Sequence, residues 1–77
     1  MKSATEIEHW LKTRVSELLE LSLDRIDSSK PLTKYGLDSS AAIGLTHELA
    51  LWLEVELDPT VVYDYPSIAQ LAKHLSP

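Results

Sequence analysis

The chain contains no cysteine among its 77 residues, so no disulfide and no cysteine-ligated zinc site can support its fold. Its apolar runs are too short for a transmembrane helix, and its N-terminal segment, MKSATEIEHW, is too polar for a signal peptide. The lack of cysteine fits a reducing compartment. A core of this size supplies only about 3 to 5 kcal/mol of net stability. We therefore expect one small, monomeric, cytoplasmic domain over residues 1–77.

Lys and Arg are missing from residues 35–72. Between Tyr35 and Ala72 there are six acids and no Lys or Arg, a formal charge of −6, whereas the remainder holds six acids and seven bases, which brings the net charge to −5. Nucleic acid is a poor partner for such a surface, because phosphate binding needs a basic footprint. The acids either keep the domain in solution or form a docking surface for a basic protein. Their segregation favours the docking surface.

Two capping boxes predict where the first and last helices begin. In Ser3-Ala4-Thr5-Glu6 the serine hydroxyl and the glutamate each reach the backbone N–H of the other, and Ser67-Ile68-Ala69-Gln70 repeats the pattern. Apolar residues at helical spacing follow the first box and predict a helix over residues 5–21. The second box predicts a last helix that ends near Leu75. The apolar residues of the first helix are Ile7, Trp10, Leu11, Val15, Leu18 and Leu19.

A second helix is predicted from Ser39 or Ser40 to Glu54, with Asp38 as its N-cap. Gly44 lies inside this segment at a cost of about 1 kcal/mol relative to alanine, which indicates either the close approach of a neighbour or ligand, or simple tolerance. A short helix is predicted over residues 59–63, with Asp58 as its cap and proline at its first position. The apolar stripe of the second helix comprises Ala42, Leu45, Leu49, Trp52 and Leu53.

The connection between the first two long helices is unusually long for a compact domain, and apolar residues are scattered through it. We expect these residues to tie the connection down across the bundle. No segment alternates with the period of a strand, so the sequence predicts an all-α fold. That fold is a small four-helix bundle of three main helices and one short helix, with a long loop between the first and second helices.

The stretch YGLDSS opens the second helix with two adjacent serines. His47 follows Ser39 by two helical turns, about 12 Å along the axis, which is too far for a direct hydrogen bond between them. The histidines, acids and glycines show no metal-ligand spacing and no phosphate-binding loop. The serines are then either competing helix caps or a site that another enzyme modifies, and we expect no intrinsic catalysis. Four apolar residues are expected in plain core rather than in a ligand cleft: Ile43, Leu49, Val62 and Ile68.

Gly36-Leu37-Asp38-Ser39, followed at a fixed separation by Tyr63-Asp64-Tyr65-Pro66-Ser67-Ile68, resembles the acyl carrier proteins of polyketide synthases over nearly the whole chain. The resemblance implies an acyl carrier domain whose motif serine, Ser39 after Asp38, carries 4′-phosphopantetheine derived from coenzyme A. It implies a carrier that presents acyl or polyketide intermediates as thioesters to partner enzymes, without catalysis of its own. The pattern D-S-x-x-A-I-G-L is similar to a subgroup loaded by fatty acyl-AMP ligases.

The resemblance also implies partners: a phosphopantetheinyl transferase, a fatty acyl-AMP ligase or acyltransferase that loads the arm, and a ketosynthase or other synthase domain. Ser40 and Gly44 depart from the family, which commonly has an apolar residue and a glutamate there. A peptidyl carrier of a nonribosomal peptide synthetase and a non-covalent module with an acidic docking face are the alternatives. Neither nucleic acid nor a membrane is expected as a partner. The predicted docking residues are Ser40, Ile43, Gly44, Glu48, Glu54, Glu56, Asp58 and Asp64.

Overall fold

The computed structural model describes residues 2–77 and opens with helix α1 (Ala4–Leu19). The first capping box is confirmed, because Ser3 Oγ accepts the Glu6 N–H at 3.1 Å and the Glu6 carboxylate accepts the Ser3 N–H at 3.1 Å. The apolar stripe of α1 turns inward, and Ile7, Leu11 and Val15 are completely buried. Helix α1 ends two residues earlier than predicted, because Glu20 adopts a left-handed conformation with φ of 55°.

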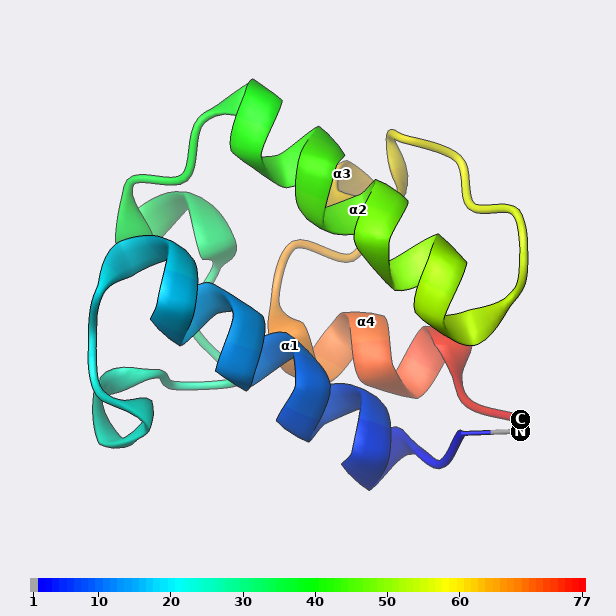
Figure 1. The fold of residues 1–77 in the computed structure, drawn as a ribbon, viewed down its shortest axis with the longest axis horizontal. Helices are drawn as coiled ribbons and strands as arrows, with labels where there is room; N and C mark the ends of the chain where they lie inside the picture. The colour runs from blue at the N-terminus through cyan, green and yellow to red at the C-terminus, as the bar shows by residue number, and fades with distance from the viewer. Residues whose placement is uncertain (1) are drawn as a thin grey trace.

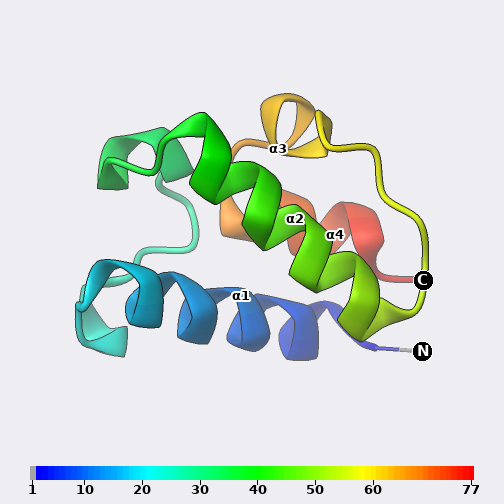
Figure 2. The ribbon, with the colours of Figure 1, turned by 45° about the horizontal axis from the view of Figure 1, so that its top comes forward.

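Helices α2 (Ser39–Leu53) and α4 (Ile68–Leu75) complete the three main helices (Figures 1 and 2). Leu45 and Leu49 of α2 are buried as predicted, and α4 packs extensively along α1. The second capping box, at Ser67, is also confirmed. One prediction is wrong: Ile43 does not belong to the core, because it lies on the outer side of α2 and is 46% exposed. Leu49, Val62 and Ile68 are buried as predicted.

The short helix α3 (Val61–Asp64) begins two residues later than predicted. Asp58 Oδ1 accepts both the N–H and the hydroxyl of Thr60, at 2.9 and 2.7 Å, so this carboxylate stabilises a turn ahead of the helix. The prediction that Asp58 caps the helix directly and that Pro59 is its first residue is therefore wrong. Val61 and Val62 of α3 are buried in the core.

The long connection between α1 and α2 is tied to the bundle, as the sequence predicts. It contains two 3₁₀ turns, η1 (Leu23–Arg25) and η2 (Leu32–Tyr35), and buries Ile26 and Leu32. The Ala69 N–H donates to the Ser28 carbonyl at 2.9 Å, and the Leu32 N–H donates to the Pro66 carbonyl at 2.8 Å. These bonds hold the connection against the start of α4, which sets the position of the chain that enters α2.

The element order over residues 2–77 is α1, η1, η2, α2, α3, α4, and a single isolated bridge between Pro31 and Ser67 is the nearest approach to strand pairing in that range. The all-α prediction is confirmed. Within the same described range, no helix is long and apolar enough to cross a membrane.

Candidate functional site

Gly36 brings the long connection into helix α2. It has φ of 81°, a left-handed conformation that suits glycine, and its N–H donates to the Thr33 carbonyl at 3.2 Å. This bond closes η2, and the chain then runs through half-buried Leu37 to Asp38. A change of chain direction at Gly36 therefore places the start of α2 at the surface.

Asp38 caps helix α2, as the sequence predicts. Its Oδ1 accepts the Ala41 N–H at 2.8 Å, and its backbone carbonyl accepts the Ala42 N–H at 3.0 Å. The sequence left open whether the two serines compete for this role. Because Asp38 performs it, neither serine hydroxyl is needed to begin the helix.

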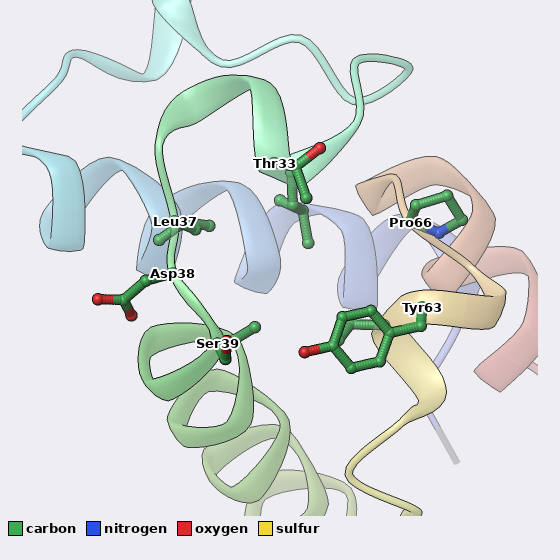
Figure 3. A pocket seen from close by; sticks show the side chains of 9 residues that line it. Thr33, Leu37, Asp38, Ser39, Tyr63 and Pro66 are labelled. Carbon is green, nitrogen blue, oxygen red and sulfur yellow. The ribbon is translucent and has the colours of Figure 1, made fainter.

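Ser39 and Ser40 are both exposed, and Ser39 lines a pocket that Ser40 does not. The pocket has a volume of about 270 Å³ and lies between η2, the start of α2 and α3. In Figure 3 the Tyr63 ring extends from α3 toward Ser39, while the Asp38 carboxylate points to the other side of the chain. Besides Ser39, Asp38 and Tyr63, the pocket is lined by Leu32, Thr33, Leu37, Ala42, Val62 and Pro66.

Tyr63 and Thr33 are site residues that the sequence analysis did not assign. They join Ser39 and Asp38 as the polar residues of an otherwise largely apolar lining. Tyr63 begins the YDYP segment, so the motif marked the right stretch of chain. Nothing local in the sequence indicated that its ring would face the second helix, because that proximity depends on the packing of α3.

The chemistry of this site suits the attachment of a phosphate ester. A group bonded to Ser39 would occupy the first turn of α2, where unpaired backbone N–H groups and the helix dipole favour negative charge. The neighbouring pocket offers apolar surface for the chain that continues from the phosphate. Ser39 and the pocket thus fit phosphopantetheine, in which a charged phosphate is followed by an arm that combines methyl and methylene groups with a hydroxyl and amides.

The structure does not assemble a serine–histidine site in the described part of the chain. His47 is exposed on α2, His9 is exposed on α1, and His74 stacks on Tyr65 with ring centroids 3.9 Å apart. No group of three or more His, Asp or Glu side chains among residues 2–77 is placed to hold a metal ion.

The predicted docking acids other than Glu48 lie outside helix α2. Glu54 and Glu56 follow its C-terminal end, Asp58 precedes α3, and Asp64 is the last residue of α3. All four are exposed. Bonds from the N–H and hydroxyl of Thr60 lower the pKa of the Asp58 carboxyl, so this acid stays ionised at neutral pH.

Glu48 differs from the other predicted docking acids because it is paired. Its Oε2 accepts hydrogen bonds from Arg14 on α1, at 2.6 Å from Nη2 and 2.9 Å from Nε. Arg14 also donates to Glu17 at 3.1 Å, and the bonds to Glu48 and Glu17 raise the pKa of the guanidinium. Tertiary packing thus brings a base from α1 to the acidic half of the chain.

A family model described as "Phosphopantetheine attachment site" matches residues 9–75, which is most of the chain. The chain belongs to this family. Its members carry 4′-phosphopantetheine, and the recognition of a carrier protein from YGLDSS and YDYPSI is confirmed.

Known carrier proteins share both the sequence and the fold of this chain. Polyketide synthase PksN of Bacillus subtilis is 35% identical over 71 residues, 92% of this chain, but the chain spans only 1% of that protein's length. The solution structure of Asl1650, an acyl carrier protein from Anabaena sp. PCC 7120 with a variant phosphopantetheinylation-site sequence, is 39% identical. It superimposes with a TM-score of 0.90 over 96% of this chain and 84% of Asl1650.

A peptidyl carrier is also similar to this protein. The crystal structure of a free-standing peptidyl carrier protein from Acinetobacter baumannii is 32% identical, with a TM-score of 0.89 over 97% of this chain and 94% of that one. The bundle is therefore common to carriers of acyl and of peptidyl cargo. The chain is a phosphopantetheine carrier domain related to acyl carrier proteins and to the carrier domains of polyketide synthases.

Proposed function

We propose that Ser39 bears the phosphopantetheine arm and that this carrier presents acyl or polyketide intermediates as thioesters on its terminal thiol. The assignment rests on the start of α2, where Asp38 caps the helix and the Ser39 hydroxyl is not needed as a cap. Ser39 is exposed there and lines the pocket. Ser40 is one residue further around the helix and does not line the pocket. Both serines are exposed, so the position beside the pocket is what favours Ser39.

In the proposed modification, a phosphopantetheinyl transferase removes the proton from the Ser39 hydroxyl. The serine oxygen forms a bond to the β-phosphorus of coenzyme A, the bond from that phosphorus to the bridging oxygen breaks, and 3′,5′-adenosine diphosphate leaves. The helix N-terminus favours the negative charge that the serine gains. The carrier supplies an accessible nucleophile, and the transferase supplies the base.

The assignment is tested by the intact mass of the protein after incubation with a promiscuous phosphopantetheinyl transferase and coenzyme A. We expect the native chain and the Ser40→Ala variant to gain one phosphopantetheine, and the Ser39→Ala variant to gain none. A gain on Ser39→Ala would move the site to another hydroxyl. Failure of all three folded proteins to gain mass would favour the non-covalent docking module, whose binding is indifferent to Ser39.

The proposed partners are the transferase, a loading enzyme and a ketosynthase or other synthase domain. The loading enzyme is a fatty acyl-AMP ligase or an acyltransferase, and D-S-x-x-A-I-G-L at residues 38–45 favours the ligase. The proposed docking residues are those of the sequence analysis, with Glu48 engaged by Arg14. We propose that the domain is a monomer without catalysis of its own, and a cytoplasmic location remains a prediction.

The second candidate function is a peptidyl carrier, because a free-standing peptidyl carrier is among the similar structures. The two functions differ in the cargo that a loading enzyme transfers to the thiol. Holo-protein is offered to a fatty acyl-AMP ligase with a fatty acid and to an adenylation domain with amino acids, each with ATP. We expect a thioester adduct by mass only with the ligase, and an aminoacyl adduct would favour the peptidyl function.

A further inference from the structure

Both tryptophans of the chain lie in one place. Trp10 of α1 and Trp52 of α2 stack with ring centroids 5.1 Å apart and ring planes 12° apart. Each residue is partly exposed, although tryptophan gains much free energy from full burial of its large ring. Figure 2 shows the end of α2 approaching the first half of α1. The indole pair is therefore built across the contact between two helices and still faces water.

A groove of about 460 Å³ opens beside the indole pair. Glu6, Trp10, Thr13 and Glu17 recur at three- and four-residue spacing, so they lie along one side of α1, and Trp52 contributes from α2. Glu6 and Glu17 are eleven residues apart, about 16 Å along the helix axis. The groove, which we call the tryptophan groove, thus has a carboxylate toward each end and indole surface between them.

The charge of the tryptophan groove suits a basic partner. The backbone N–H and hydroxyl of Ser3 lower the pKa of the Glu6 carboxyl, which keeps this group ionised at neutral pH. Arg14, the one Lys or Arg of the lining, already donates to Glu17 and to Glu48. No base of the lining is therefore left to pair with Glu6, and its negative charge is available to an incoming cation.

The chain itself shows that the indole pair accepts a cation. Lys2 Nζ lies 4.9 Å from the centroid of the Trp52 ring, within the range of a cation–π interaction. Lys2 does not line the tryptophan groove, so the groove remains open to a second cation. Arginine suits this position better than lysine, because its planar guanidinium can lie on an indole while its N–H groups donate to a carboxylate.

We propose that the tryptophan groove docks a partner protein through an exposed arginine, whose guanidinium lies on the Trp10 indole and donates to the Glu6 carboxylate. These two side chains are one turn apart on α1, so a single guanidinium can reach both. Tryptophan and arginine are among the residue types that most often dominate the affinity of protein interfaces.

This docking site is separate from the modified end of the carrier. Trp52 follows Ser39 by thirteen residues, about 20 Å along the axis of α2. A partner held at the tryptophan groove therefore leaves Ser39 accessible. The inference goes beyond the proposed function and does not depend on modification of Ser39.

The indoles report their own occupancy, because the chain has no other tryptophan. A short peptide with two arginines separated by alanines is titrated into the unmodified, ¹⁵N-labelled full chain, and the two indole N–H resonances are followed. Matched peptides carry lysine, or carry citrulline, which has nearly the same shape as arginine but no charge. We expect the arginine peptide to shift both indole resonances, the lysine peptide to bind several-fold more weakly, and the citrulline peptide at least tenfold more weakly.

Substitutions then separate the tryptophan groove from general attraction to an acidic protein. Glu6→Gln is expected to weaken the arginine peptide about fivefold to tenfold, and its capping box should persist because Gln70 fills the same position in the second box. The control Glu20→Gln removes the same charge from an exposed residue of α1 outside the groove, and it should leave binding unchanged. Trp10→Leu should weaken binding about tenfold.

Several outcomes would overturn the proposal. They are equal affinities of the arginine and citrulline peptides, binding that leaves both indole resonances in place, equal losses in Glu6→Gln and Glu20→Gln, and no binding of the arginine peptide at millimolar concentration. Trp10 also packs against the core, so circular dichroism checks the fold, and the two glutamate variants decide the question if Trp10→Leu does not fold. The mass experiment on Ser39 reports the proposed function separately, so the two can fail independently.

Discussion

At the scale of single residues, the two glycines of the chain have different backbone conformations. Gly36 has φ of 81° where the chain turns into α2, a conformation that costs an L-residue about 1–2 kcal/mol. Gly44 is helical, and a Cβ added there would meet no atom within 4 Å. A close neighbour of Gly44 within residues 2–77 is therefore excluded, which leaves the approach of a ligand or simple tolerance of glycine at a cost in helix stability.

We expect opposite effects from the same substitution at these two positions. Gly36→Ala should lower the free energy of unfolding by about 1–2 kcal/mol, because the left-handed backbone then becomes strained. Gly44→Ala should raise it by up to about 1 kcal/mol, because alanine is the better helix former and space is available. Urea unfolding at neutral pH measures both, and a loss of stability in Gly44→Ala would contradict the open space beside it.

At the scale of elements, one ion pair joins α1 to α2. The Arg14 and Glu48 side chains are 29% and 44% exposed, so the pair is only partly shielded from water. Trp10 of α1 and Trp52 of α2 stack nearby with ring centroids 5.1 Å apart and add apolar area to the same contact. The ion pair therefore supplements a contact that packing already holds.

A double-mutant cycle with Arg14→Gln and Glu48→Gln should give a coupling of about 0.5–1 kcal/mol in low salt, the usual range for partly exposed pairs. The coupling should shrink at about 0.5 M salt. Urea unfolding of the four proteins at both ionic strengths provides the values. A coupling near zero in low salt would mean that the Arg14–Glu48 geometry contributes nothing to stability.

At the scale of the whole molecule, three surface carboxylates stabilise turns and caps in different regions. The Ser3 backbone N–H and hydroxyl lower the pKa of the Glu6 carboxyl. In the same way, the hydroxyl and N–H of Ser29 lower the pKa of the Asp27 carboxyl. The N–H and hydroxyl of Thr60 lower the pKa of the Asp58 carboxyl. A lowered folded-state pKa means that the unfolded chain binds protons first as the pH falls. Their stabilisation is present above the ordinary carboxyl pKa and is lost in acid.

We therefore expect the free energy of unfolding to fall as the pH drops below the ordinary glutamate value of about 4.5. The two capping boxes offer a matched pair, since α1 uses Glu6 and α4 uses Gln70 in the same position. Glu6→Gln should flatten the acid loss, and Gln70→Glu should steepen it. Urea unfolding between about pH 7 and pH 3 measures the slopes, and unchanged slopes would show that the boxes do not titrate with folding.

Much of this protein could be predicted from the sequence because the relevant interactions are local. The capping boxes at Ser3 and Ser67 and the N-cap at Asp38 each join groups that are three residues apart. A short stretch of sequence is therefore enough to recognise them. The motif around Ser39 identified the family for the same reason. The start of α3 was misplaced because Asp58 can cap a helix or stabilise a turn, and both use the same local bonds.

Tertiary structure alone decided the features that join distant segments. The approach of Arg14 to Glu48 spans 34 residues, so no local pattern marks it, and it removes one acid from the expected docking face. The packing of α3 places Tyr63 beside Ser39, and the orientation of α2 leaves Ile43 in solvent rather than in the core. Helical periodicity predicts which residues share a side, but only the packed neighbours determine which side is buried.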